Sequence, residues 1–521
     1  MQRLRSALTV WLVPLGIAIG ISALLMIGAR WIEFWVAAPK GGPWFRNFIF
    51  PPDPALARDS ILNSLQTLAG VFGISITVVA FVVQLAATRY TSRVVDLFLK
   101  DFRNQAIFLV YVVPLVMGMW LSNVIDASDY SRGAAGVFMI LATLATVLII
   151  PYFKFVFVFL QPNNIIATIE RSIESELKEA CADPQRVARA RREVSNSIKQ
   201  LSDIALSSLA QSDIVLCLEA LGSIRQVGLF YLRVKPALPA QWHQIDSGHI
   251  VGLSEEMWQE MVRNRTWVEM EIFKQYEVAY TNSLKKVRDV NSCVARGLRE
   301  IAEQAAVTED QASLAFLIKG FNTLINYALS DRDIRTAVNV LYQYRLLAEA
   351  VLYLPDVLER IATHLRYYGH SSQRRRIYFI MDAVAYDLRI LIEMTFQCFP
   401  ENGDRLLKVF LGLDQIAETK EDLAFLRGVR KSQAMLAGYF IRIGRTDLAR
   451  SILDDMANET QDFLRTVRRD LFALTSKEFW EIEDRGVSFY YVEEEHRPSV
   501  ELFFSWLLKE KPVPLEIVHS A

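Results

Sequence analysis

Residues 60–88 read SILNSLQTLAGVFGISITVVAFVVQLAAT, and this stretch of 29 residues between Asp59 and Arg89 has no charged side chain. The hydrocarbon core of a bilayer is about 30 Å thick, and about 20 helical residues cross it. Because backbone N–H and C=O groups in lipid must be paired within the same segment, such a run has to be helical. The stretch therefore predicts a transmembrane helix rather than a buried segment of a water-soluble protein.

Three further uncharged runs support the same conclusion, at residues 7–29, 104–125 and 133–153. The last continues as an apolar segment around Lys154, which we interpret as a lysine extending toward the headgroups. The first follows Arg3 and Arg5, as a signal peptide would, but it exceeds the usual apolar core of 7–15 residues, so we interpret it as a retained anchor. The sequence thus predicts four spans, at about 7–29, 60–88, 104–125 and 133–158.

Basic residues near the spans predict the orientation. If each span crosses once, one side of the membrane carries nine Lys and Arg residues close to the spans and the other side carries five. The larger group includes Arg89, Arg93, Lys100 and Arg103, which lie in the short connection after the second span. Cytoplasmic loops carry the excess of Lys and Arg. We therefore expect both termini in the cytoplasm.

The rest of the chain has a different composition. Over all 521 residues, 52% are hydrophobic, 22% are charged and the mean hydropathy is +0.21, but charged residues return at ordinary density after residue 160. Apolar residues there recur at helical spacing, for example Val187, Val194, Ile198 and Leu201 after the helix start at Asp183-Pro184. The fold class is therefore all-α, with a transmembrane domain over 1–160 and a mostly helical cytoplasmic domain over 161–521. A short β-hairpin is predicted near 481–492.

Two local patterns predict how helices of this region begin and pair. Thr308 with Gln311 three residues on has the spacing of a capping box. The spacing of small, aromatic and glycine residues after position 436 is typical either of a tetratricopeptide helix pair or of a generic pair of antiparallel helices. Those residues are Ala437, Phe440, Gly444, Ala449, Leu453 and Met456. We find no second unit in a 34-residue register.

The sequence offers little catalytic chemistry. It contains no GxxxxGK[ST], GxGxxG, HExxH or GxSxG motif, and its six histidines and four cysteines are scattered. We expect no enzymatic activity, no cofactor and no metal site. Lys plus Arg total 57 and Asp plus Glu total 58, so the net charge of −1 gives no support for a nucleic-acid partner.

The second span carries a polar and small stripe. Its members follow one another at alternating steps of three and four residues, so all of them share one helical face. They are Asn63, Gln66, Gly70, Gly73, Thr77, Ala80 and Gln84. An amide that faces acyl chains finds no hydrogen-bond partner, so we expect this face to contact protein or water. It either packs against another helix or lines a hydrated path, and an oligomer with this helix at its axis would satisfy both.

The residues after the stripe carry a family resemblance. They comprise Gln84-Leu85-Ala86, Tyr90-Thr91-Ser92-Arg93, Phe98-Leu99-Lys100-Asp101 and Asn104-Gln105. This block resembles a bacterial family of predicted membrane proteins, the domain of unknown function numbered 2254. The resemblance implies four amino-terminal spans, a wide first loop and a cytoplasmic carboxy-terminal region in a bacterial inner membrane protein, and it implies no activity. This chain departs from the expected pattern at 208–214, which reads SLAQSDI.

The connection over 89–103 is a short amphipathic element between membrane and cytoplasmic regions. Arg93 can pair with Asp96 or Asp101, and Asn104 and Gln105 begin the next span. We interpret Arg93, Asp96, Asp101, Asn104 and Gln105 as an elbow that fixes the turn.

Two functions remain open. The first is a channel-like or transport-associated membrane protein with the second span at the axis of a homo-oligomer. The second is a membrane-tethered scaffold or sensor whose cytoplasmic helical domain binds a protein partner. In both, the lipid bilayer and a second copy of the chain are the expected contacts.

Overall fold

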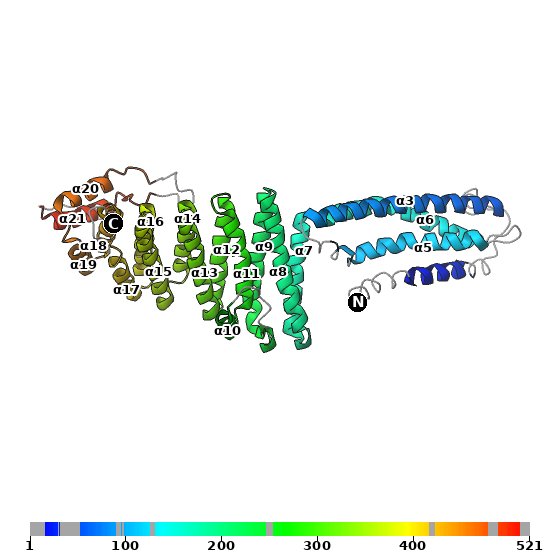
Figure 1. Cartoon of the computed structure of the whole chain (residues 1–521), viewed down its shortest axis with the longest axis horizontal. Coiled ribbons are helices and arrows are strands. Elements are labelled where there is room, and N and C mark those ends of the chain that lie inside the picture. Colours follow the sequence, from blue (N-terminus) through cyan, green and yellow to red (C-terminus); the bar gives the residue numbers. More distant parts are fainter. Residues whose placement is uncertain are drawn as a thin grey trace, which may run out of the picture. The chain divides into compact units, whose positions relative to one another are not determined.

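The computed structural model describes residues 16–29, 31, 53–89, 95, 98–99, 101–124, 131–245, 254–415, 422–477 and 488–510. The regular elements within these ranges are α-helices and short 3-10 helices, which confirms the all-α prediction. The chain forms two compact units, Met1–Thr168 and Ile169–Ala521 (Figure 1). Their boundary falls inside the helix α7 (Pro162–Ala182), whereas the sequence analysis placed it between residues 160 and 161.

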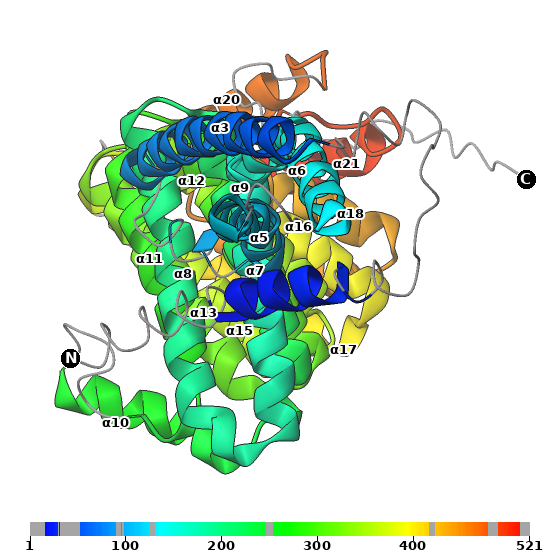
Figure 2. The same ribbon diagram turned by 90° about the vertical axis from the view of Figure 1, so that its right-hand side faces the viewer.

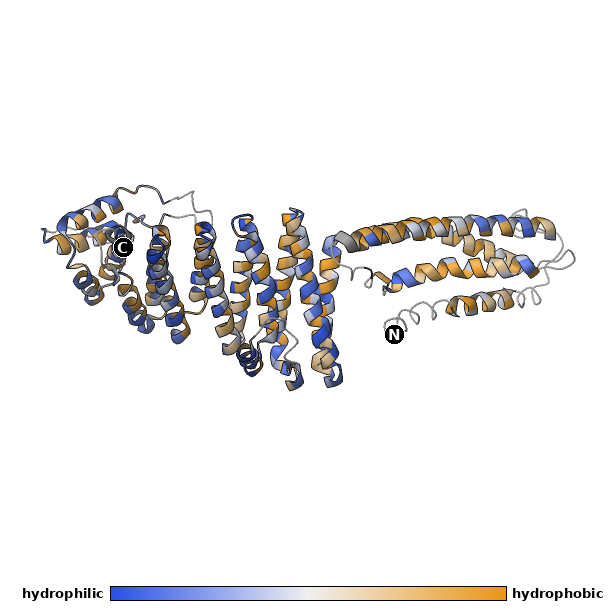
Figure 3. Cartoon of the chain, viewed as in Figure 1, coloured by the Kyte–Doolittle hydropathy of each residue, from blue (hydrophilic) through white to orange (hydrophobic). Residues whose placement is uncertain are grey.

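The first unit is a bundle of apolar helices. α3 (Pro54–Arg89), α5 (Phe102–Val124) and α6 (Arg132–Phe159) are long and apolar enough to cross a bilayer and correspond to three of the predicted spans. Colouring by hydropathy shows that many residues of these helices are hydrophobic (Figure 3). The first predicted span, 7–29, is described only from Gly16, and Gly16–Ala29 is an apolar helix; residues 7–15 lie outside the described part.

The core of this bundle is built from close contacts between α3, α5 and α6. Ile61, Leu68, Met117 and Phe138 are fully buried there. Gly118 on α5 allows the closest approach, because a Cβ atom at that position would lie 2.5 Å from the Phe138 ring on α6. The packing thus depends on a missing side chain at Gly118, as is common where membrane helices meet.

The second unit is a row of antiparallel helices in two layers (Figures 1 and 2). One layer contains α9 (Ile214–Val234), α12 (Arg288–Val307), α14 (Ile334–Ala350), α16 (Tyr378–Cys398), α18 (Asp422–Arg442) and α21 (Arg497–Leu508), each packed on the next. The other layer contains α8 (Val187–Ala210), α11 (Trp267–Ser283), α13 (Gln311–Ser330), α15 (Pro355–Arg374) and α17 (Pro400–Leu411). The remaining elements are α10 (Glu255–Asn264), α19 (Thr446–Met456), α20 (Gln461–Phe472), η1 (Pro184–Arg186), η2 (Lys235–Ala237) and η3 (Ala240–His243).

α9 is an interior helix of this second unit, although its length and composition would also suit a span. It packs between α8 and α12. Its Arg225 forms an ion pair of 2.7 Å with Glu300 on α12. Burial against neighbouring helices, rather than against lipid, explains its apolar character.

Aspartate-capped turns connect many of the helices. Asp213, Asp310 and Asp333 each accept a hydrogen bond from the backbone N–H three residues ahead. Each also donates its own N–H to the carbonyl five residues behind, which closes the preceding helix. Asp310 therefore caps α13, and the predicted capping box at Thr308 and Gln311 is wrong, because Thr308 still belongs to the end of α12. Asp183 does act as a cap, but of the 3-10 helix η1, and α8 begins at Val187.

One layer of the second unit is an internal repeat. An arginine is the twelfth residue of four of its helices, and they are Arg225 in α9, Arg299 in α12, Arg345 in α14 and Arg389 in α16. Arg299 bonds Gln343 on the next helix at 2.9 Å, and Arg345 pairs with Asp387 at 3.1 Å. The segment YQYRLLAE at 342–349 returns as YDLRILIE at 386–393, a period of 44 residues. The second unit is thus a helical-repeat array, and from α12 to α16 its spacing of 46 and 44 residues is near that of HEAT-type repeats.

Two further predictions concern the end of the chain. The segment Ala437–Met456 forms the pair α18–α19, which turns at Gly444 with a φ of 78°. The predicted β-hairpin near 481–492 falls partly outside the described residues, and the described part, Ser488–Val492, forms a turn without a strand. Phe489 of this segment stacks on Tyr386 of α16 at 4.8 Å. Aromatic packing onto the array therefore fixes this segment where strand pairing was expected.

Removal of the Asp333 cap tests how much these turns stabilise the array. Its carboxylate accepts hydrogen bonds from Thr336 N at 3.2 Å, Thr336 Oγ1 at 2.8 Å and Lys285 N at 2.9 Å. We expect Asp333→Ala to lower the free energy of unfolding by about 2 kcal/mol, measured by urea denaturation of the purified protein. Asp289→Ala, at an exposed first-turn position, is the control. Equal losses in the two variants would contradict a special role for the turn.

Candidate functional site

The polar and small stripe lies on the outward face of α3. Its seven members, Asn63, Gln66, Gly70, Gly73, Thr77, Ala80 and Gln84, are all exposed. The opposite face of the helix, which includes Ile61, Leu68, Ser75, Val79 and Val83, is buried against the rest of the bundle. The helices described in this unit therefore leave the stripe uncovered.

The middle of the stripe is a shallow, open surface. A Cβ atom at Gly70 or Gly73 would find no heavy atom within 4 Å. Thr77 donates its hydroxyl to the Gly73 carbonyl at 2.9 Å, so this donor is already paired within the helix. Around these small residues, Ile74, Phe81 and other large apolar side chains are exposed, as expected for a lipid-facing surface. The stripe is thus a narrow furrow in an apolar helix surface.

The amides lie toward the two ends of the stripe. The middle residue of the uncharged run 60–88 is Ile74. With a rise of 1.5 Å per residue, Gln66 lies about 12 Å and Gln84 about 15 Å from it along the helix axis. Because half the hydrocarbon thickness is about 15 Å, these side chains reach the outer parts of the core, where polar groups can extend to the headgroups. The central part of the stripe consists of Gly70, Gly73, Thr77 and Ala80.

Three of the five predicted elbow residues hold the start of α5. Asp101 accepts the Arg103 N–H at 2.8 Å and so caps the helix. Asn104 and Gln105 donate to the carbonyls of residues 98 and 99, both at 3.4 Å. Arg93 and Asp96 lie outside the described residues, so the predicted ion pair with Asp101 stays a prediction.

α6 anchors the elbow from the other side. Tyr152 donates its hydroxyl to the Asn104 side chain at 2.8 Å. The Arg103 guanidinium lies 5.7 Å from the centre of the Phe155 ring. Phe98, almost fully buried, meets Phe159 edge to face at 5.6 Å. The elbow is therefore fixed by an amide–hydroxyl bond and aromatic contacts, two kinds of interaction that the charge pattern did not suggest.

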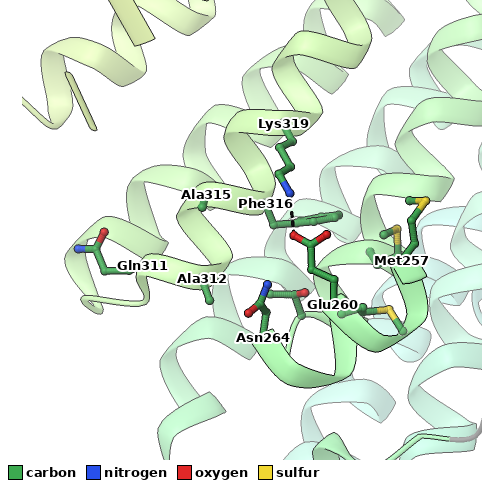
Figure 4. A pocket seen from close by; sticks show the side chains of 11 residues that line it. Met257, Glu260, Asn264, Gln311, Ala312, Ala315, Phe316 and Lys319 are labelled. Carbon is green, nitrogen blue, oxygen red and sulfur yellow. Dashed lines mark hydrogen bonds and ion pairs between the residues drawn. The ribbon is translucent and has the colours of Figure 1, made fainter. Parts of the chain in front are cut away.

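A methionine-lined pocket of about 340 Å³ lies between α10, α11 and α13 (Figure 4). The side chains of Met257, Met261, Met270 and Phe316 form its apolar wall. At one end, Glu260 and Lys319 form an ion pair of 2.7 Å across the pocket. Thioethers adapt to many apolar shapes and favour aromatic contacts, so the pocket suits a large apolar side chain. Sequence reasoning missed it because its walls come from residues up to 62 positions apart (257 and 319).

Behind this pocket is a buried ionic cluster that joins η2, α11 and α13. The Lys235 ammonium has three close partners, each at 2.7 Å. They are a carboxylate oxygen of Glu269, a carboxylate oxygen of Asp310 and the hydroxyl of Ser313. A serine–lysine pair can serve as nucleophile and base only when the lysine is neutral. Here two carboxylates stabilise the charged ammonium, and Ser313 is completely buried. The cluster therefore ties three elements together and offers no access to a substrate.

His243 borders this cluster and has a lowered pKa. Its side chain is 6% exposed. Burial, together with the nearby positive charges of Lys235 and Arg265, lowers its pKa from 6.5 to about 4. The imidazole is therefore neutral in the folded protein at physiological pH.

A group of side chains that could act as metal ligands lies just before α21. Side-chain ligand atoms of Glu493, Glu495 and His496 lie within 4.8 Å of one another. Lys477 already places its ammonium 2.7 Å from Glu493. That ion pair supplies the positive charge that the carboxylate requires, so the arrangement is explained without an ion.

The lowered pKa of His243 predicts a loss of stability in acid. Between pH 6.5 and about 4 the unfolded chain binds a proton at His243 that the folded protein excludes, so stability falls as the pH falls through this window. We expect His243→Gln to remove this term, which is about 3 kcal/mol between pH 7 and pH 4. Urea denaturation at pH 7 and pH 4 should show that the stability advantage of the wild type over the variant shrinks by that amount. An advantage independent of pH would contradict the buried neutral imidazole.

Comparisons with known proteins give one family match. No curated protein matches the chain. Among solved structures, a circular tandem repeat protein described as having a novel repeat topology and enhanced subunit contact surfaces aligns with 88% of this chain and 95% of its own, at 13% identity and a TM-score of 0.33. Residues 8–207 match the model of a family described as "Predicted membrane protein (DUF2254)". The described membrane helices, α7 and most of α8 lie within this match, so this part of the chain is similar to that family of predicted membrane proteins.

Proposed function

We propose that this chain is a non-enzymatic, multi-pass protein of the bacterial inner membrane, with both termini in the cytoplasm, which self-associates through the stripe on α3. The observation that carries the proposal is the outward direction of the whole stripe, with open space over Gly70 and Gly73. Large lipid-facing side chains surround this furrow, whereas the furrow itself exposes helix backbone.

A second α3 fits this furrow better than an acyl chain does. Small residues let two helix backbones approach closely, which increases van der Waals contact along the axis. All copies insert in the same direction, so a symmetric pair of α3 helices is parallel and each stripe residue meets its counterpart. Gln66 and Gln84 each carry an amide donor and an amide acceptor. Such side chains can pair with their own counterparts at both ends of the contact.

The second unit supports a scaffold role for this assembly. Helical-repeat arrays present extended surfaces that bind other proteins. The methionine-lined pocket between α10 and α13 can accept a large apolar side chain of a partner. The central stripe is made of small residues rather than of polar ones, which favours helix packing over a hydrated path. We therefore propose a membrane-tethered scaffold or sensor as the function best supported.

Disulfide cross-linking tests the contact between α3 helices. In a Cys398→Ser background, which removes the exposed native cysteine, Ala80→Cys should give cross-linked dimers on mild oxidation of native membranes. Val78→Cys, exposed on the same helix but off the stripe, is the matched control and should give at least tenfold less. Equal cross-linking at the two positions, or none at Ala80, would refute the proposed interface.

A hydrated path along the oligomer axis is the second candidate. It is favoured by the exposed amides at both ends of the stripe and by the Thr77 hydroxyl between them. If α3 lines a channel, Gln84→Leu should change the ion flux of reconstituted vesicles severalfold, because it removes a polar group from the wall. Val78→Leu should leave the flux unchanged. Absence of flux through the native protein under voltage, tension or a salt gradient would leave the scaffold role.

A further inference from the structure

The helices of the second unit end at two opposite edges, and one of these is strongly basic. We call it the basic edge and define it by the turns after α11, α13 and α15. Hydrogen bonds and ion pairs show that these turns are neighbours: Lys285 pairs with Asp331 at 3.2 Å, and Arg375 bonds Ser330 at 3.3 Å. Residues far apart in sequence therefore form one continuous surface.

Each of the three turns contributes cations. The first carries Lys285, Lys286 and Arg288, the second Arg332 and Arg335, and the third the run Arg374–Arg376. All but Arg375 are exposed. Of the acidic groups on this edge, Asp333 caps α14, Asp331 pairs with Lys285, and Asp289 is exposed in the first turn of α12, so the eight basic residues outnumber them. The edge thus presents a net positive surface.

Three of these cations have a left-handed backbone conformation. Lys285, Arg332 and Arg376 have φ values of 59°, 56° and 57°. This left-handed conformation favours glycine or asparagine and is unfavourable for other residues. The same conformation occurs at Ser212, Arg265, Glu309 and Lys509, so it is a general feature of the turns in this unit. Exposed apolar side chains of Ile334 and Tyr378 lie next to two of the three cations.

The chain enters the second unit at the basic edge. Glu170 of α7 lies 2.7 Å from Ser223 of α9, and Lys178 lies 5.3 Å from the Phe230 ring, so α7 and α9 run in the same direction. The end of α9 meets the end of α12 through the ion pair between Lys235 and Asp310, so these two helices also run in the same direction. The start of α7 therefore belongs to the same edge as the start of α12, where the basic turns lie. Only Leu160 and Gln161 separate α7 from α6.

We propose that the basic edge binds the anionic phospholipid headgroups of the membrane in which the chain is anchored. Lys and Arg near an anionic leaflet are attracted to it, and the attraction decays within a Debye length. The tether keeps the headgroups at a high local concentration. Ile334 and Tyr378 supply the apolar and aromatic groups that partition into the interface. The proposal rests on the membrane location of the chain and is independent of how α3 associates.

Amide hydrogen exchange of the full-length protein in nanodiscs tests this proposal. One nanodisc contains only phosphatidylcholine, and the other contains phosphatidylcholine and phosphatidylglycerol in a ratio of about 7:3. We expect peptides that cover 284–288, 331–335 and 374–378 to exchange severalfold more slowly in the anionic nanodisc, and we expect high salt to remove the difference. Peptides from the opposite edge should exchange equally in both.

Neutralised variants provide matched controls. The triple variant Lys286→Gln, Arg335→Gln, Arg374→Gln should lose the protection, because three fewer cations weaken the association by about a hundredfold. The control triple variant Arg263→Gln, Arg360→Gln, Arg450→Gln, on exposed residues of the opposite edge, should keep it. Unchanged exchange at that opposite edge shows that the first variant is folded.

Three results would overturn the proposal. They are equal exchange of the basic edge in the two nanodiscs, protection that survives in the first triple variant, and protection that only added single-stranded RNA produces. The last result would assign the edge to nucleic acid instead of lipid.

Discussion

The acyl chains of lipid offer no hydrogen-bond partner to a polar group, and they fill a groove on a helix less tightly than a second helix does. These two constraints determine the structure of the first unit. They require 29 uncharged residues around Ile74 to be helical. They also make the furrow over Gly70 and Gly73 a candidate contact surface, because exposed backbone between large apolar side chains is poorly solvated by acyl chains. On α3 the small residues of the stripe face outward beside exposed Ile74 and Phe81, an arrangement that suits packing against a second membrane helix.

In the second unit, apolar side chains must be buried away from water. Each helix there has one apolar face, which it buries by packing on the next pair of helices, so the array extends in one direction. The aspartate-capped turns keep successive helices antiparallel, and the arginines at equivalent positions bridge neighbours within a layer. Because successive helices alternate in direction, the turns after α11, α13 and α15 lie at the same edge. Basic residues scattered over about 90 positions of sequence (285 to 376) therefore form a single surface.

Sequence reasoning captured the features that depend on local physics. An uncharged run of sufficient length identifies a span, and steps of three and four identify a common helical face. The same periodicity could not show what that face meets, because the direction of the stripe depends on where α5 and α6 pack.

The Thr308 cap was misplaced by two residues, because the carboxylate of Asp310 caps the helix instead. A 34-residue register could not show the repeat, because the equivalent residues Arg225, Arg299, Arg345 and Arg389 are separated by 74, 46 and 44 residues. The Lys235 cluster joins residues 34 and 75 positions apart (Glu269 and Asp310), and no local pattern predicts such a contact.

What covers Gly70 and Gly73 in the membrane is the central question for this protein. A high-resolution structure of the full chain in a lipid nanodisc answers it directly. Our account predicts the α3 helix of a second copy lying against this face at a distance that only small residues permit. Ordered acyl chains over the two glycines in a monomeric protein would contradict it.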